Sequence, residues 1–199
     1  MVWDMYWGWR SNPEFDADTA GAKGHEMEMV EAILGLGSNL GDRLGNLKRA
    51  RRLLRQACGT HESAASPIYE TEPVGVPPRY AGIYFLNAVM AFRSRFSSAQ
   101  WLAAIRWVEE QLGRRRGSER NAPRTIDVDL LLYGDQVIDN KELTVPHPRL
   151  KERLFVLKPL ADIRPELKLP GMSRSVSELL REMEPLRGIH LFATEWEPE

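Results

Sequence analysis

The chain has 199 residues, a length that fits one domain with a sizeable hydrophobic core. Its formal net charge is −1, so its overall charge attracts neither nucleic acid nor an anionic membrane, and any phosphate must be bound by local clusters. No apolar run approaches the roughly 20 residues of a membrane span, and a single cysteine cannot form an internal disulfide. These features predict a folded, soluble protein of the cytoplasm that binds no nucleic acid and no membrane.

Residues 1–29 differ in composition from the rest of the chain. They hold three of the six tryptophans, followed by a stretch rich in Asp, Glu, Gly and Ala that shows no periodicity. We interpret them as an irregular extension, which is either disordered or docked through its aromatic residues onto the protein or a partner. The domain is expected over residues 30–190, with a tail over residues 191–199.

Hydrophobic periodicity predicts the elements of this domain. In chain order they are a strand over 30–37, a helix over 42–57, a strand over 66–70, a strand over 84–93, a helix over 97–112 and a strand that follows an arginine-rich loop over 114–124. The order β-α-β-β-α-β is that of the ferredoxin-like α+β fold, an antiparallel sheet with helices packed on one face. C-terminal additions are expected beyond it, with a short helix within residues 141–163 and another over 175–183.

Asp127 and Asp129 stand at alternate positions of the last of these strands, in the apolar run RTIDVDLLLYG. Residues i and i+2 of a strand point to the same face, roughly 6.5–7 Å apart. Two carboxylates on an apolar strand are costly unless something positive meets them. A pair of Mg²⁺ ions about 3.5–4 Å apart, bound to substrate phosphates, would satisfy them, and so would structural salt bridges. The strand alone favours neither interpretation.

Five arginines directly precede the two aspartates: Arg114, Arg115, Arg116, Arg120 and Arg124. A guanidinium presents a fixed fork of donors that matches phosphate oxygens and stabilises the charge of a transferring phosphoryl group. A solvated loop is the alternative, but the adjacent aspartates favour phosphate binding. The chain has no GxxxxGK(S/T) loop, and Leu40 interrupts the dinucleotide fingerprint in GLGSNLG, so neither common nucleotide-binding fold is indicated.

Two further motifs carry side chains suited to binding small molecules. His147 lies between two prolines and is followed by three basic residues, which suggests an anion near a stiff turn, although a lone histidine is usually structural. Phe85 and Asn87 share one face of their strand, after the Pro- and Gly-rich loop YETEPVG. A ring with a carboxamide can receive a flat polar heterocycle, although most such pairs are core packing.

Taken in order, the motifs resemble the 6-hydroxymethyl-7,8-dihydropterin pyrophosphokinase family of folate biosynthesis. They are GLGSNLGDR, YETEPVG, FLNAV, the pair Glu109 and Arg114, PRTIDVDLLLYG, and TVPHPRL with the ERLFVLKPL after it, and they cover about residues 32–170. The last two are the most specific. The resemblance implies an ATP- and Mg-dependent diphosphotransferase, which transfers pyrophosphate from ATP to the pterin hydroxymethyl oxygen by attack on the β-phosphorus and releases AMP.

The resemblance also implies roles for individual residues. Asp127 and Asp129 would hold two Mg²⁺ ions, while Arg114 and Arg124 would engage the phosphates. The residues of the ATP side would be Glu109, Arg114, Leu130 through its backbone, Thr144, His147 and Arg153. The residues of the pterin side would be Phe85 and Phe155, which sandwich the ring, Asn87, which hydrogen-bonds it, and the backbone of Thr71, Pro73 and Val74. We expect a monomer whose partners are these two small molecules.

Three positions depart from the pattern of the best-known members. Asn121 stands where they have a loop tryptophan, Phe85 replaces a tyrosine, and Glu72 replaces a second proline in the pterin loop. None of these changes removes a proposed metal ligand or phosphate-binding arginine. Activity is therefore expected, with altered closure over the pterin.

Two other functions compete with this interpretation. A ferredoxin-like RNA-binding module would need exposed aromatic residues in an RNP1-like run, and the chain contains no such run. A catalytically silent pterin- or nucleotide-binding protein would not require the two aspartates and the arginines matched to the phosphates, all of which are present.

Overall fold

A computed structural model describes residues 28–114 and 121–196 of the chain. Nearly all of the expected N-terminal extension lies outside these described residues, as do Arg115, Arg116 and Arg120 of the arginine-rich loop, and their predicted roles stay predictions. Within the two described ranges, no helix is both long enough and apolar enough to cross a membrane.

The strands and helices follow the predicted order, with additions between and after them. They are β1 (Val30–Ser38), α2 (Arg43–Cys58), β2 (Glu62–Ala65), β3 (Ile68–Thr71), the 3-10 helix η2 (Pro78–Tyr80), β4 (Phe85–Ser94), α3 (Ser98–Gln111), β5 (Asp127–Tyr133), β6 (Ile138–Asp139), β7 (Thr144–Val145), the 3-10 helix η3 (Leu150–Glu152), α4 (Leu154–Ile163), α5 (Val176–Arg181) and β8 (Ile189–Ala193). Three helices begin where side chains accept hydrogen bonds from the first turn: Asp42 caps α2, Ser97 caps α3 and Ser175 caps α5.

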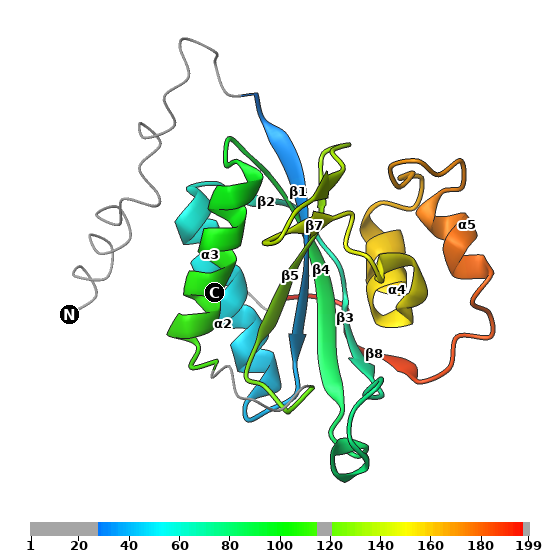
Figure 1. Ribbon diagram of the computed structural model, residues 1–199. Helices are drawn as coiled ribbons and strands as arrows, with labels where there is room; N and C mark the ends of the chain where they lie inside the picture. The colour runs from blue at the N-terminus through cyan, green and yellow to red at the C-terminus, as the bar shows by residue number, and fades with distance from the viewer. Residues whose placement is uncertain (1–27, 115–120, 197–199) are drawn as a thin grey trace.

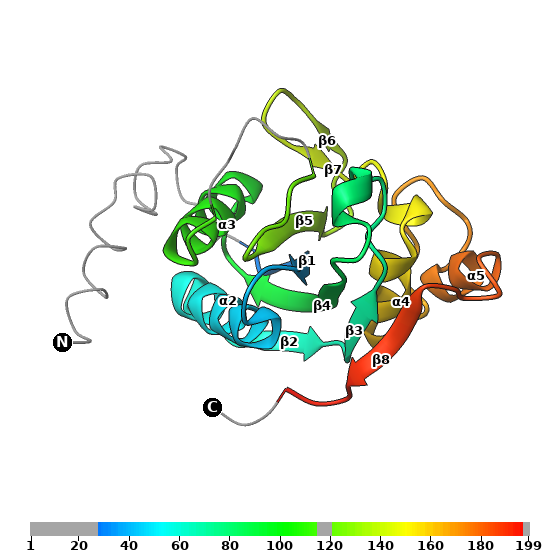
Figure 2. The ribbon, with the colours of Figure 1, turned by 90° about the horizontal axis from the view of Figure 1, so that it is seen from below.

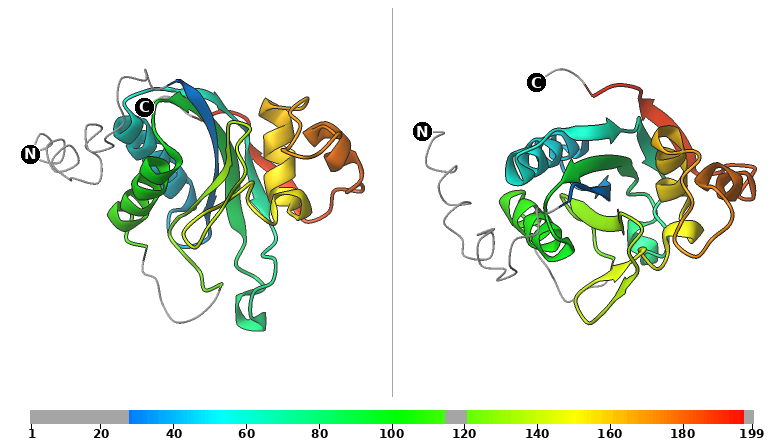
Figure 3. Two further views of the ribbon diagram at one scale, coloured as in Figure 1. Left: turned by 45° about the horizontal axis from the view of Figure 1, so that its top comes forward. Right: turned by 90° about the horizontal axis from the view of Figure 1, so that it is seen from above.

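One antiparallel sheet organises the molecule, with the strand order β5-β1-β4-β3-β8. β2 and β3 follow one another along the same side of β4. Helices α2 and α3 cover one face of the sheet, while α4 and α5 lie on the other face, as Figures 1 and 2 show from two directions. The α+β class is thereby confirmed, and the C-terminal additions supply a second helical layer that the sequence did not place (Figure 3). The edge strand β8 includes residues 191–193 of the expected tail.

The strand predicted over residues 66–70 forms as β3, and a separate strand that was not predicted, β2, precedes it. The break between the two strands has a local cause. Ser66 interrupts the regular ladder of backbone hydrogen bonds. Its N–H donates to the Val89 carbonyl over 2.9 Å, but the Val89 N–H donates to Oγ of Ser66, over 3.0 Å, and not to a backbone carbonyl. Pro67 then has no N–H to offer the sheet. The chain therefore leaves the sheet at Ser66 and re-enters it at Ile68.

Both faces of the sheet are buried, and the alternation along β5 decides which side chains reach which face. Val128 and Leu130 pack into the cluster under α2 and α3, together with the fully buried Trp101. Leu131 packs into the opposite cluster under α4. Asp127 and Asp129 project on the α4 side of the sheet, where they line a cavity instead of packing against an apolar helix face.

Candidate active site

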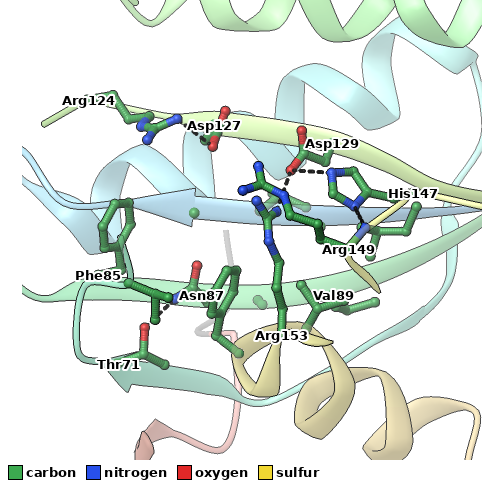
Figure 4. A pocket seen from close by; sticks show the side chains of 18 of the residues that line it. Thr71, Phe85, Asn87, Val89, Arg124, Asp127, Asp129, His147, Arg149 and Arg153 are labelled. Carbon is green, nitrogen blue, oxygen red and sulfur yellow. Dashed lines mark hydrogen bonds and ion pairs between the residues drawn. The ribbon is translucent and has the colours of Figure 1, made fainter. Parts of the chain in front are cut away.

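The floor of the site is the surface of the sheet where residues of β5, β1 and β4 lie side by side in register. The antiparallel register pairs Asp127 with Gly37 and Gly37 with Asn87, while Asp129 pairs with Gly35 one step along. A Cβ on Gly37 would stand 2.8 Å from Oδ1 of Asn87, closer than real side chains approach. Glycine at this position therefore keeps an open floor between the acidic strand β5 and the amide on β4 (Figure 4).

A first cavity of about 620 Å³ opens above this floor, between the loop after β3 and the start of α4. Five of the six residues predicted for a pterin line it, namely Thr71, Val74, Phe85, Asn87 and Phe155, whereas Pro73 does not. The cavity also contains residues to which no role was assigned, among them Arg149, Glu72, Val89 and Val156. The sequence signalled Arg149 only as one member of a basic turn.

A second hollow of about 470 Å³ lies at the outer edge of β5, between α3 and the segment that contains β7. It is lined by five of the six residues predicted for the ATP side: Glu109, Arg114, Leu130, Thr144 and His147. The sixth, Arg153, lines the first cavity. Four residues line both spaces, namely Arg114, Asp127, Asp129 and His147. The two aspartates therefore stand where the two hollows meet.

Arginines surround the acidic pair. Arg114 lies 2.6 Å from Oδ1 of Asp127, and Arg124 lies 2.8 Å from Oδ2 of the same carboxylate. Asp129 has a more distant partner, because Nη1 of Arg153 is 3.6 Å from its Oδ2. Burial and the neighbouring Asp127 carboxylate raise the pKa of Asp129 to about 6. The negative charge of Asp129 is thus only partly compensated by the protein.

Glu109 of α3 joins the acidic strand to the arginine-rich loop. Its side chain is buried, and Oε1 accepts a hydrogen bond from the N–H of Val128 over 3.0 Å. The same oxygen accepts a hydrogen bond from the guanidinium of Arg114. Because both contacts meet at one carboxylate oxygen, Glu109 fixes the start of β5 and the position of Arg114 together. The sequence placed Glu109 on the ATP side only by resemblance, since nothing in its pattern signals this contact.

His147 is held as a neutral ring beside Asp129. Burial, followed by the charges of Arg153 and Arg149, lowers the pKa of His147 to about 4. Its Nδ1 accepts a hydrogen bond from the N–H of Arg149 over 3.2 Å, so the ring proton resides on Nε2. That atom lies 3.9 Å from Oδ2 of Asp129 (Figure 4). A neutral N–H donor therefore faces the region between the two hollows.

The amide and the rings of the first cavity are oriented by neighbours. Nδ2 of Asn87 donates a hydrogen bond to Oγ1 of Thr71 over 2.7 Å, which leaves the amide oxygen and one N–H for a ligand. The sequence anticipated only backbone contacts from Thr71. The Arg124 guanidinium is 5.9 Å from the Phe85 ring centre, and that of Arg153 is 5.4 Å from the Phe155 ring centre. Each ring predicted to stack on a heterocycle thus has a cation beside it.

The donor set fits a hard cation that is shared with phosphate. Asp127 and Asp129 supply carboxylate oxygens, the ligands that Mg²⁺ prefers. Among the described residues, no group of three or more His, Cys, Asp or Glu side chains could hold a metal ion. Mg²⁺ is commonly bound by one or two carboxylates with substrate phosphates and water in the remaining positions. The pair therefore suits a cation that arrives with a phosphorylated ligand.

Comparison with known proteins places this geometry in a family. The model of the family described as 7,8-dihydro-6-hydroxymethylpterin-pyrophosphokinase (HPPK) matches residues 33–165. The chain is 38% identical over 147 residues to the 2-amino-4-hydroxy-6-hydroxymethyldihydropteridine pyrophosphokinase of Bacillus subtilis, which covers 74% of this chain and 86% of that protein. It is 36% identical over 163 residues to the folic acid synthesis protein fol1 of Schizosaccharomyces pombe, which covers 82% of this chain.

Several relatives are longer proteins. The chain spans 22% of the length of the fission yeast protein and 25% of the folate synthesis bifunctional protein of Pisum sativum, to which it is 41% identical over 135 residues, or 67% of this chain. Among solved structures, wild-type HPPK-DHPS of Plasmodium falciparum with pterin and p-hydroxybenzoate matches with a TM-score of 0.61 at 16% identity. That match covers 80% of this chain and 44% of the other, and at this identity it shows a common fold.

Proposed function

Because the chain belongs to the 7,8-dihydro-6-hydroxymethylpterin-pyrophosphokinase family, we propose that it transfers pyrophosphate from ATP to 6-hydroxymethyl-7,8-dihydropterin. The observation that carries the proposal is the meeting of two hollows at Asp127 and Asp129, with arginines around them. The pterin hydroxymethyl oxygen forms a bond to the β-phosphorus, and the bond from that phosphorus to the oxygen bridging the α-phosphate breaks. AMP leaves with that oxygen, and the hydroxyl proton passes to solvent or phosphate.

ATP occupies the second hollow in this proposal. Its lining by Leu130, Thr144 and His147 leaves backbone and side-chain polar groups around a nucleotide, while Arg114 stands at the junction with the first cavity. The phosphates extend toward Asp127 and Asp129, where Arg114, Arg124 and Arg153 present guanidinium groups. Catalysis then consists mainly of alignment and charge stabilisation, because phosphoryl transfer needs little covalent help from the protein.

The pterin occupies the first cavity, between Phe85 of β4 and Phe155 of α4. Asn87 hydrogen-bonds the edge of the ring with the amide atoms that Thr71 leaves available. The backbone near Thr71, Pro73 and Val74 completes that edge. In this pose the substituent of the ring points along the floor of the sheet toward Asp127 and Asp129, which Gly37 leaves accessible.

Asp127 and Asp129 would hold two Mg²⁺ ions together with phosphate oxygens. When bound, the ions neutralise charge on the phosphates and lower the barrier to attack on phosphorus. The residues contribute orientation: Glu109 keeps Arg114 in place, and His147 offers its Nε2 proton without adding charge. No side chain is required as a general base in this scheme.

We also propose that a single copy in the cytoplasm suffices for the reaction. Residues of one chain line both hollows, so no second copy is needed to complete them. All the assigned residues lie within the domain that we propose over residues 30–190.

The proposal is tested by AMP release from ATP with Mg²⁺ and the hydroxymethyl pterin. Wild type should turn over, whereas Asp127→Asn and Asp129→Asn should each lose about a hundredfold or more of kcat, the scale expected for a group that organises transition-state charge. Asp135→Asn is the matched control, since Asp135 is exposed in the turn after β5 and lines neither hollow. Absence of turnover by wild type, or full activity of both variants, would refute the proposal.

A further inference from the structure

A polar cluster joins β3 to α4 outside the first cavity. The hydroxyl of Tyr69 donates a hydrogen bond to Oδ2 of Asp162 over 2.5 Å. The ammonium of Lys158, one helical turn earlier, pairs with Oδ1 of the same carboxylate. That ammonium also lies 5.0 Å from the centre of the Tyr69 ring. None of the three residues lines the cavity, so any effect on a ligand must pass through the elements that they join.

The helix in this cluster forms one wall of the cavity. Arg153, Phe155 and Val156 stand at the first turn of α4 and line the first cavity. Asp162 stands near the other end of the same ten-residue helix. Because a short helix moves as a rigid body, the contacts of Asp162 and Lys158 with the sheet help to set where Phe155 stands.

The strand in this cluster also orients the opposite side of the cavity. Register pairs Tyr69 with Asn87, and Thr71, two residues along β3 on the same face, pairs with Phe85. Thr71 accepts the hydrogen bond that fixes the Asn87 amide. β3 therefore holds the edge-binding amide through Thr71 and the helical wall through Tyr69.

The surroundings of Tyr69 keep its hydroxyl protonated and able to donate the hydrogen bond. Burial and the hydrogen bond to Asp162 raise the pKa of Tyr69, so its hydroxyl remains a donor throughout the physiological range. The carboxylate of Asp162 contacts both the Lys158 ammonium and the Tyr69 hydroxyl. Replacement of Tyr69 by phenylalanine would keep the ring beside the ammonium and remove the polar contacts of its hydroxyl with α4.

We infer that Tyr69, acting through Asp162 on α4, is a positioning residue that sets the width of the cavity between Phe85 and Phe155 and thereby the affinity for the pterin. The inference rests on the proposed function for the identity of the ligand. A ring stacked between two aromatic faces needs both within van der Waals distance, and a gap of 0.5–1 Å already forfeits about a quarter to a half of each contact. Loosening α4 should therefore weaken pterin binding most, with a smaller effect on ATP binding, because Arg153 is the residue of the proposed ATP side that stands on α4.

The test compares Tyr69→Phe with Tyr133→Phe. Tyr133 also donates its hydroxyl to a partner in the protein, the Phe96 carbonyl at 2.8 Å, but it packs in the core cluster under α2 and α3. Both variants should lower the melting temperature by similar amounts. Only Tyr69→Phe should raise the dissociation constant of the hydroxymethyl pterin, by about three- to tenfold, as measured by fluorescence titration with an ATP analogue present.

Two further measurements separate positioning from general destabilisation. Asp162→Asn should raise the same dissociation constant, and the double variant with Tyr69→Phe should show no further rise, because the two groups act through one contact. KM for ATP and kcat should stay within about twofold of wild type. An unchanged pterin dissociation constant in Tyr69→Phe, or a rise of equal size in Tyr133→Phe, would overturn the inference. Failure of the proposed function would appear differently, as an absence of AMP release by wild type.

Discussion

Gly37→Ala is the change whose outcome the structure specifies most sharply. Gly37 lies in extended backbone near the end of β1, and it is not among the glycines with positive φ, so alanine can adopt its conformation. The added methyl group would stand 2.8 Å from Oδ1 of Asn87 and 3.7 Å from Cδ1 of Phe85. Any cost therefore arises from contact with residues of the first cavity and not from backbone strain.

The expected loss of stability depends on which side chain the added methyl group would displace. Asn87 is buried and its Nδ2 is fixed by the 2.7 Å hydrogen bond to Thr71, so its amide cannot retreat without lengthening that bond. Overpacking costs about 1–3 kcal/mol, and a weakened buried hydrogen bond adds about 1 kcal/mol. For a chain of this size, a loss of about 2 kcal/mol lowers the melting temperature by roughly 4–8 °C. Displacement of the Asn87 amide, which we propose binds the pterin, by a few tenths of an ångström should raise KM for the pterin about tenfold.

The assay is steady-state AMP release with the pterin varied at saturating ATP, together with thermal unfolding of the free protein. Gly35→Ala is the matched control on the same strand and face, because its Cβ would meet only the flexible Leu131 side chain, at 3.2 Å. We expect a smaller loss of stability and a pterin KM within about threefold of wild type for that variant. If Gly37→Ala keeps the wild-type pterin KM, the amide of Asn87 does not bind the substrate as proposed.

Two other predictions concern contacts at the rim of the cavity and at the far end of α4. Asn121 has a positive φ of 59°, and its Nδ2 donates a hydrogen bond to the Gly75 carbonyl over 2.8 Å. Because glycine tolerates that backbone, Asn121→Gly removes only the hydrogen bond, and it should raise the pterin KM about two- to fivefold with little change in melting temperature. An unchanged KM would count against this link between the two loops. Burial opposes ionisation of Glu31, but the hydrogen bond and the charge of Arg164 lower the pKa of Glu31 overall. The ion pair therefore stabilises the fold fully above the ordinary glutamate pKa. That contribution disappears as pH falls through the lowered pKa. Urea unfolding of wild type and Glu31→Gln should accordingly differ by about 1 kcal/mol or less at pH 7, and the difference should vanish as pH falls through the lowered pKa of Glu31. A difference that stays constant with pH would contradict the assignment.

The sequence predicted the fold where a local pattern was sufficient. Short apolar runs along β1 and β4 and the Ser97 cap of α3 mark elements without reference to the rest of the chain. The break at Pro67 could have been predicted, since a residue without an N–H interrupts a ladder. The strand β8 could not, because IHLFA carries no distinctive alternation and is a strand only through its register with β3.

In the candidate site, too, some residues can be recognised from a local pattern in the sequence and others cannot. The carboxylates of Asp127 and Asp129 are visible as a pair because strand periodicity alone puts them on one face. The roles of Glu109 and Tyr69 are not visible, since each depends on a contact between elements that are far apart in the chain: Glu109 meets Val128, and Tyr69 meets Asp162. Resemblance to a family located Glu109, but it gave no reason for a buried acid there, and it assigned no role to Tyr69, the first residue of YETEPVG.

The arrangement around Asp127 argues that cation and nucleotide bind together. Both oxygens of this carboxylate are already engaged, one by Arg114 and the other by Arg124. A cation that takes either oxygen must displace a guanidinium. Arg114 keeps its contact with Glu109, whereas a displaced Arg124 needs another anion. In the proposed function, the phosphates of ATP in the second hollow would supply that anion within the same site. Exchange of carboxylate for phosphate therefore keeps each arginine paired, whereas binding of the cation alone would leave one unpaired at a half-buried position, which makes the combined event the favourable one.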